Sequence, residues 1–219
     1  MLAVMNKVRY GKAFLSLVND PEKTDKIFDM ADAMMSFPNS SGRKLVLENA
    51  MAQEGFKALH QRMYLPGDAD LDKLIEMPVG TLGYEYAAHM KKYNLSVDFY
   101  RAVAPTDALK YFALRMRQTH DIWHVLTGYN TTVRDELALQ AFVIAQTRSG
   151  ISVSILAAGM LSVLRTHPGD LIELMDGVVE GFQRGKKAEF LLGFAWEELW
   201  GLTLEEARAL AGITPRAGD

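Results

Sequence analysis

Apolar residues recur along this chain at spacings of three and four, the pattern of helices that bury one face. The period-two alternation that is typical of half-exposed strands is hard to find in the sequence. Proline and glycine separate the periodic stretches. The predicted helices cover residues 21–35, 43–62, a short stretch that ends before 78, 84–93, 107–127, a helix that begins at 132, 151–165, one that begins after 167–170, and 204–211.

Capping signals agree with these helices. Asp20 and Pro21 form an N-cap followed by proline at the first helical position. Thr203 and Glu206 have the spacing of a capping box. No internal repeat or low-complexity linker divides the chain. The sequence therefore predicts one all-α, multi-helix domain that spans residues 1–219.

Composition excludes several classes of function. Of the 219 residues, 49% are hydrophobic and 23% are charged, as in ordinary soluble globular proteins. The formal net charge is −3 and the basic residues are dispersed, so no nucleic-acid partner is expected. Cysteine is absent, which excludes disulfides, thiolate zinc sites, iron–sulfur clusters and thiol nucleophiles.

Two segments bear on membrane contact. The apolar stretch 151–164 is shorter than the ~20 residues that a bilayer-crossing helix needs. Residues 1–20 carry Lys7, Arg9 and Lys12 among apolar positions and lack the pattern of a secretory signal. They predict an amphipathic helix that packs on the core, with a membrane surface as the alternative.

Four side chains that can bind a metal lie close together in a chain with five histidines. His120 and His124 are four residues apart, so a helix places them on one face with Cβ atoms about 5–6 Å apart. Asp121 borders that face. Residues 127–132 predict a helix stop and a new N-cap, with His124 and Glu136 at equal distances from its middle. If two antiparallel helices meet at this turn, Glu136 closes a metal site between them.

The ligand types favour some metals over others. Two imidazoles with carboxylates suit zinc first, then iron, manganese or magnesium, whereas a calcium site would be all oxygen. An open coordination position would allow Lewis-acid chemistry. A His-x-x-x-His pair also occurs on helix surfaces or as a buried core pair, and that alternative stays open.

Other metal-dependent enzyme classes fit less well. In His-Glu-x-x-His proteases the middle glutamate is the general base, and the shorter Asp121 would reach the water poorly. A helical phosphohydrolase needs a further histidine and aspartate, and the surroundings of His89 and Asp170 do not match that class.

Flexible and flat apolar side chains are frequent, with 12 methionines and 10% aromatic residues. Such side chains can line an adaptable apolar cavity, but they also form ordinary helical cores, which is the commoner outcome. Residues 152–159 mix small and large side chains, which pack closely or leave room for a slender ligand.

Residues 117–129 (Arg-Gln-Thr-His-Asp-Ile-Trp-His-Val-Leu-Thr-Gly-Tyr) closely resemble the signature of the coenzyme Q biosynthesis protein 4 family. The metal motif of that family is His-Asp-x-x-His, then eleven residues and Glu. It falls on residues His120, Asp121, His124 and Glu136.

The likeness covers about residues 25–213. One position departs from the family, which usually has glycine where this chain has Asp135. An acid there suits a helix N-terminus, and the alternative is an outer-shell carboxylate of the metal site. Further stretches that resemble family landmarks are Gly42-Arg43, residues 80–83 with Tyr86, residues 139–142, residues 196–200, Leu204 and Arg208.

The resemblance implies an all-helical protein of ubiquinone biosynthesis that binds a divalent ion and, in an apolar cavity, an isoprenoid tail. It implies a metal-dependent carbon–carbon lyase that removes the C1 carboxylate of a polyprenylated hydroxybenzoate, coupled to oxidation there. The alternative is a non-catalytic scaffold that binds prenyl lipid and organises the pathway's enzymes. Arg117, three residues before His120, is a candidate for binding the anionic headgroup, or else a solvated charge.

The expected partners follow from the same resemblance. They are a prenylated quinone precursor or isoprenoid lipid, the other ubiquinone-biosynthesis enzymes, and a membrane surface, with a homodimer left open. Residues 1–20 are poor in serine and arginine, so the resemblance is to bacterial-type members. The expected location is the cytoplasm, at the inner face of the inner membrane.

Overall fold

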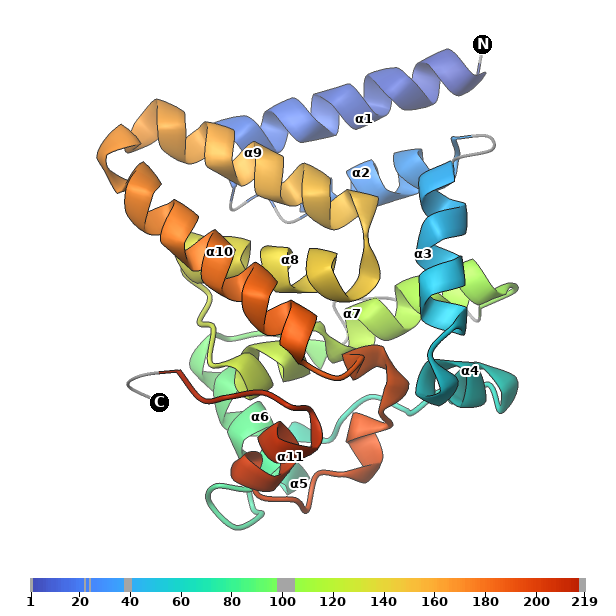
Figure 1. Ribbon diagram of the computed structural model, residues 1–219, viewed down its shortest axis with the longest axis vertical. Helices are drawn as coiled ribbons and strands as arrows, with labels where there is room; N and C mark the ends of the chain where they lie inside the picture. Colours follow the sequence, from blue (N-terminus) through green and yellow to red (C-terminus); the bar gives the residue numbers. More distant parts are fainter. Residues whose placement is uncertain (1, 22, 24, 38–40, 98–104, 217–219) are drawn as a thin grey trace. The chain divides into compact units, whose positions relative to one another are not determined.

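The computed structural model describes residues 2–21, 23, 25–37, 41–97 and 105–216 (Figure 1). Within them the regular structure is helical, apart from one isolated antiparallel bridge between Thr81 and Thr203, so the all-α prediction is confirmed. Among these residues, no helix has both the length and the apolar character to cross a bilayer. The elements are α1 (Leu2–Asn19), α2 (Asp25–Met35), α3 (Ser41–Met51), α4 (Glu54–Gln61), α5 (Leu71–Leu74), α6 (Leu82–Lys92), α7 (Ala108–Thr127), α8 (Val133–Thr147), α9 (Gly150–Thr166), α10 (Leu171–Lys187), α11 (Leu204–Leu210) and the short 3-10 turns η2 (Pro168–Asp170), η3 (Leu191–Gly193) and η4 (Trp196–Glu198).

The chain divides into two compact units. Unit 1 consists of Met1–Val46 and Thr131–Lys186, and unit 2 consists of Leu47–Asn130 and Lys187–Asp219. Because each unit takes two separate stretches of sequence, no single cut in the chain would separate them. The prediction of one domain over the whole chain stays a prediction.

In unit 1, α1 packs against α2 and α9, and α9 packs against α8 (Figure 1). Ala13 and Leu17 of α1 are buried in one cluster with Met30 of α2 and Ala158 of α9. The prediction that the first helix packs on the core is therefore confirmed. The opposite face of α1 is exposed, so the alternative of contact with a membrane surface stays open.

Glycine lets α10 approach the backbone of α8. A Cβ atom at Gly185 would stand 2.6 Å from the carbonyl oxygen of Phe142, closer than any side chain allows. The carbonyl of Gly185 also accepts a 2.8 Å hydrogen bond from Nε2 of buried Gln146. This contact fixes the C-terminal part of α10 against α8.

In unit 2, α7 packs against α6, α11 and η3. Phe56 of α4 contacts the rings of Tyr111, Phe112 and Phe190, with centroids 5.6, 6.1 and 6.2 Å away. The indole nitrogen of Trp196 donates a 2.9 Å hydrogen bond inside the same segment. The aromatic cluster therefore packs against the first two turns of α7.

A buried ion pair joins α7 to η4. Arg115 donates two hydrogen bonds to the carboxylate of Glu197, at 2.7 and 3.1 Å, and a third to the carbonyl of Phe194 at 3.3 Å. Nearby, burial raises the pKa of Tyr64 to about 12, and the negative charges of Glu197 and Glu198 add to the rise. This part of the core therefore contains charged side chains that pair with each other.

Two predicted helix boundaries are wrong. The predicted helix 43–62 is two helices, because the backbone is extended at Gln53 (φ −91°, ψ 114°). A Cβ atom at Gly55 would lie 2.6 Å from a carbonyl oxygen of η3, so a tertiary contact shapes the start of α4. The helix predicted to begin at Pro21 begins at Asp25 as α2, and Pro21 lies in a turn before it.

Candidate metal centre

The predicted histidines lie in the last turns of α7. The helix begins after Asp107, whose side chain accepts a 2.9 Å hydrogen bond from the amide of Lys110. It ends at Gly128, whose φ of +74° is the left-handed conformation that glycine adopts without strain. The amide of Gly128 donates to the carbonyl of His124 at 2.8 Å. The prediction of a helix over residues 107–127 is confirmed.

His120 and His124 direct their Nε2 atoms at each other, 3.3 Å apart. Their ring centroids are 4.9 Å apart and the ring planes are nearly perpendicular, at 87°. At a tetrahedral ion with metal–nitrogen bonds of about 2.0–2.1 Å, two ligand nitrogens lie about 3.3–3.4 Å apart. The spacing therefore fits two ligands of one ion, and it also suits a hydrogen bond between the two rings.

One hydrogen bond determines which nitrogen of His124 faces His120. Its Nδ1 lies 2.8 Å from the carbonyl oxygen of Tyr129. A carbonyl only accepts hydrogen bonds, so Nδ1 carries a proton, and in the neutral ring Nε2 presents its lone pair. Histidine ligands of metal ions are commonly oriented by such a bond. His124 is buried, with 2% of its surface exposed, so water does not compete for this bond.

Two arginines hold the end of α7. Arg208 of α11 donates to the carbonyls of Leu126 at 2.9 Å and Val125 at 3.3 Å. Arg216 lies over the ring of Tyr129, with Cζ 4.7 Å from its centroid. Cations are favourable beside the carbonyls at a helix C-terminus. In the sequence, Arg208 stands out only through the resemblance to the family, because nothing in its spacing from the histidines indicates this contact.

The other two predicted residues of α7 are half-buried. Asp121 follows His120 directly, and Arg117 precedes it by nearly one helical turn. These positions are compatible with a metal ligand and with a residue that binds an anionic headgroup. Both roles stay predictions.

Glu136 lies in the first turn of α8 and is half-buried. The side chain of Thr132 caps this helix by accepting a 3.3 Å hydrogen bond from the amide of Asp135. The predicted helix start at Thr132 is therefore confirmed. An acid at position 135, in the first turn, is favourable at the positive end of the helix dipole.

Comparison with known proteins adds three findings. The family described as coenzyme Q (ubiquinone) biosynthesis protein Coq4 matches residues 5–217. A mitochondrial ubiquinone biosynthesis protein COQ4 homolog of Xenopus tropicalis is 32% identical over 208 residues, which are 94% of this chain and 72% of that protein. The human COQ4 homolog, also mitochondrial, is 30% identical over 213 residues, covering 93% of this chain and 76% of that protein.

A crystal structure from Nostoc punctiforme, of a protein named for ubiquinone biosynthesis, matches the fold with a TM-score of 0.83. Its sequence is 31% identical, and the match covers 95% of this chain and 99% of that chain. The resemblance seen in residues 117–129 is thus confirmed over nearly the whole sequence. The chain belongs to the Coq4 family of coenzyme Q (ubiquinone) biosynthesis proteins.

Proposed function

We propose that this chain is a metal-dependent carbon–carbon lyase that removes the C1 carboxylate of a polyprenylated hydroxybenzoate in ubiquinone biosynthesis. Membership of the family supplies the pathway. The observation that carries the proposal is the histidine pair, with Nε2 atoms 3.3 Å apart and the Nδ1 proton of His124 held by a carbonyl. These are the spacing and the orientation that two imidazole ligands of one ion require.

The proposed ligands are His120, Asp121, His124 and Glu136. The two histidines approach each other within α7, and Asp121 and Glu136 are added on their sequence spacing. Imidazoles with carboxylates suit zinc first, then iron, manganese or magnesium. A bound divalent ion would supply Lewis-acid polarisation of a substrate oxygen.

Other residues of the chain would bind the ring acid and its prenyl tail. Arg117 is assigned to the substrate carboxylate, because a guanidinium can donate two parallel hydrogen bonds to it. The apolar helices α8 and α9 are assigned to the prenyl tail. When carbon dioxide leaves, a proton must take its place at C1. In the oxidative form a hydroxyl takes that place: water supplies its oxygen, dioxygen accepts the two electrons, and hydrogen peroxide is released.

Turnover by the purified protein tests this proposal. With zinc, iron, manganese or magnesium and a polyprenylated hydroxybenzoate under air, we expect release of carbon dioxide and one product, either the C1–H or the C1-hydroxylated ring. Removal of the metal by a chelator should lower the rate about a hundredfold or more, and readdition should restore it. The product, identified by mass spectrometry, distinguishes the two forms. No turnover with any of the four metals would contradict the proposal.

A second candidate function is a scaffold that binds prenyl lipid and organises the pathway's other enzymes. It is favoured by the apolar surface of α9, where Val153, Leu161 and Leu164 are exposed. Exposed apolar patches commonly mark contacts with proteins or lipids. A homodimer would also need such a surface. Prenyl lipid that co-purifies with the protein, without turnover, would support this function.

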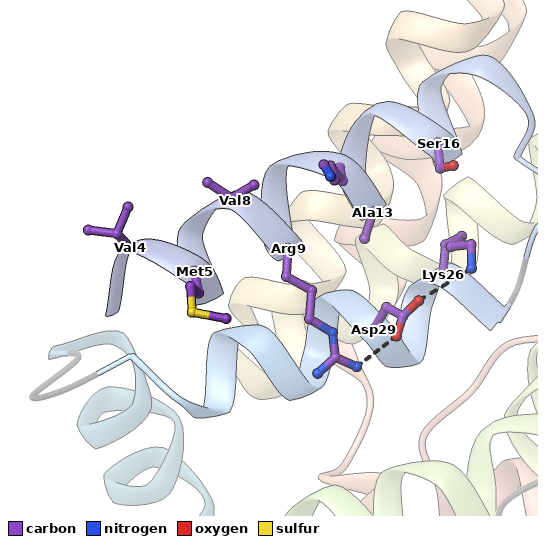
Figure 2. A pocket seen from close by; sticks show the side chains of 9 residues that line it. Val4, Met5, Val8, Arg9, Ala13, Ser16, Lys26 and Asp29 are labelled. Atoms are coloured by element: carbon purple, nitrogen blue, oxygen red, sulfur yellow. Dashed lines mark hydrogen bonds and ion pairs between the residues drawn. The ribbon is translucent and has the colours of Figure 1, made fainter. Parts of the chain in front are cut away.

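We also propose that the chain is peripheral to the cytoplasmic face of a membrane and touches it through α1. Val4, Val8 and Leu15 share one face of this helix and are 65%, 51% and 60% exposed. Lys7 and Lys12 flank that face, and α1 has no acidic residue. Val4 and Val8 also line the groove of about 520 Å³ that α1 forms with Lys26 and Asp29 of α2 (Figure 2). An apolar stripe between cations suits an anionic lipid surface.

Changing both Val8 and Leu15 to aspartate should lower binding to vesicles that contain phosphatidylglycerol by about tenfold or more, since each buried apolar side chain contributes about 1.5–3 kcal/mol. Co-sedimentation measures the bound fraction. Val79 is 78% exposed and lies outside α1, so Val79→Asp is the control and should leave binding unchanged. Equal binding by the double variant and the unchanged protein would exclude α1 as the contact.

A further inference from the structure

The last turn of α6 reaches the histidine pair from the side. The ring of His89 stacks on that of His124, with centroids 5.5 Å apart and planes 22° from parallel. Four residues further on, Tyr93 lies 4.9 Å from His89 and donates its hydroxyl proton to Oδ1 of Asn130 at 3.1 Å. Helix α6 therefore contacts His124 through His89. Tyr93, which follows the helix as its C-cap, contacts Asn130, the neighbour of the Tyr129 carbonyl that accepts from His124.

The other end of α6 is fixed to the C-terminal segment of unit 2. The amide of Gly83 donates a 3.0 Å hydrogen bond to the carbonyl of Trp200. Tyr86 stacks on the indole ring of Trp200 at 5.1 Å, and Met90 is fully buried. A helix that is held at both ends presents His89 from a rigid support, as an accurately placed site requires.

The two contacts of His124 restrain different motions of its ring. The hydrogen bond from Nδ1 to the carbonyl of Tyr129 lies along the ring plane, so it fixes the direction in which that nitrogen points. It opposes rocking of the ring out of its plane only weakly. The face of His89, nearly parallel to the ring, opposes that rocking.

We propose that His89 is a positioning residue of the metal site, which holds the ring plane of His124 so that its Nε2 lone pair stays directed at the ion. The proposal rests on the proposed metal-binding function. It assigns a role to His89. From the sequence alone, His89 is a candidate only for a helical phosphohydrolase site, and its surroundings do not match that class. The signal that identifies it is a ring contact between residues far apart in sequence.

Cobalt(II) binding to the purified full chain tests this role, because the visible absorption of cobalt(II) reports ligand geometry. His89→Ala should weaken cobalt binding about tenfold, the lower end of what loss of a residue that supports a metal ligand causes, and should shift the absorption bands. His89→Phe retains a flat ring against His124 and should restore most of the affinity. His60, whose ring contacts Tyr111 at 5.2 Å, supplies the matched control, and His60→Ala should change neither readout.

A second readout does not depend on the metal. In the metal-free protein, the proton on Nδ1 of His124 can be followed by nitrogen-15 NMR, and His89→Ala should shift or broaden that signal. If a folded His89→Ala protein matches the unchanged chain in this signal, in cobalt affinity and in absorption, the proposal is wrong. If the unchanged chain binds no cobalt and the variant still alters the NMR signal, the metal function fails while the positioning of His124 by His89 stands.

Discussion

Zinc affinity should fall by about two to three orders of magnitude when His124 is replaced by alanine. Four-ligand zinc sites gain about 10–16 kcal/mol, or roughly 3 kcal/mol for each ligand, so loss of one imidazole has a large effect. His124 is also the ligand candidate whose orientation is fixed, through the 2.8 Å contact of Nδ1 with the carbonyl of Tyr129. Competition with a chromophoric chelator at pH 7 measures the affinity.

Three further variants separate the ligands from their neighbours. His167 is an exposed histidine outside the motif, so His167→Ala should leave zinc affinity unchanged. Glu136→Gln and Asp121→Asn each remove one negative charge at nearly constant size and should each lower zinc affinity, and a variant that leaves the affinity unchanged removes that carboxylate from the ligand set. If His124→Ala binds zinc as tightly as the unchanged chain, the histidines are a core pair joined by a hydrogen bond.

The features of α7 that could be predicted are those encoded within one or two turns of helix. Asp107 accepts from an amide three residues later, and Gly128 takes a left-handed φ, so both ends of the helix are local events. The approach of His120 to His124 is local too, because helix geometry alone places residues four apart on one face. A motif of this kind can be placed before any tertiary contact is known.

The support of the site depends on contacts between distant parts of the chain, which spacing cannot reveal. His89 meets His124 across two helices, and Arg208 reaches carbonyls more than eighty residues earlier. The break between α3 and α4 has the same origin, because the backbone at Gly55 lies against η3. In each case the local sequence pattern is compatible with several arrangements of the helices, and the structure shows which arrangement occurs.

The stability of unit 2 also depends on a contact of Arg115 that the sequence pattern does not reveal. Nothing in its spacing along α7 identifies a partner, yet its side chain is 0% exposed and its partner Glu197 is 12% exposed. Charged groups are rarely buried unless they are paired, because removal from water costs several kcal/mol for each ion. The interaction joins residues 82 positions apart. It makes the core of unit 2 dependent on both members of the pair.

Arg115→Ala should therefore lower the free energy of unfolding by about 3–5 kcal/mol, because it leaves Glu197 buried without its partner. Urea unfolding followed by circular dichroism at pH 7 measures the loss. The half-exposed pair of Arg62 and Glu198, 3.3 Å apart, is the matched control, and Arg62→Ala should cost less than about 1 kcal/mol. The double variant Arg115→Met/Glu197→Gln removes both charges and should recover part of the stability. If Arg115→Ala costs no more than Arg62→Ala, the buried pair does not stabilise unit 2.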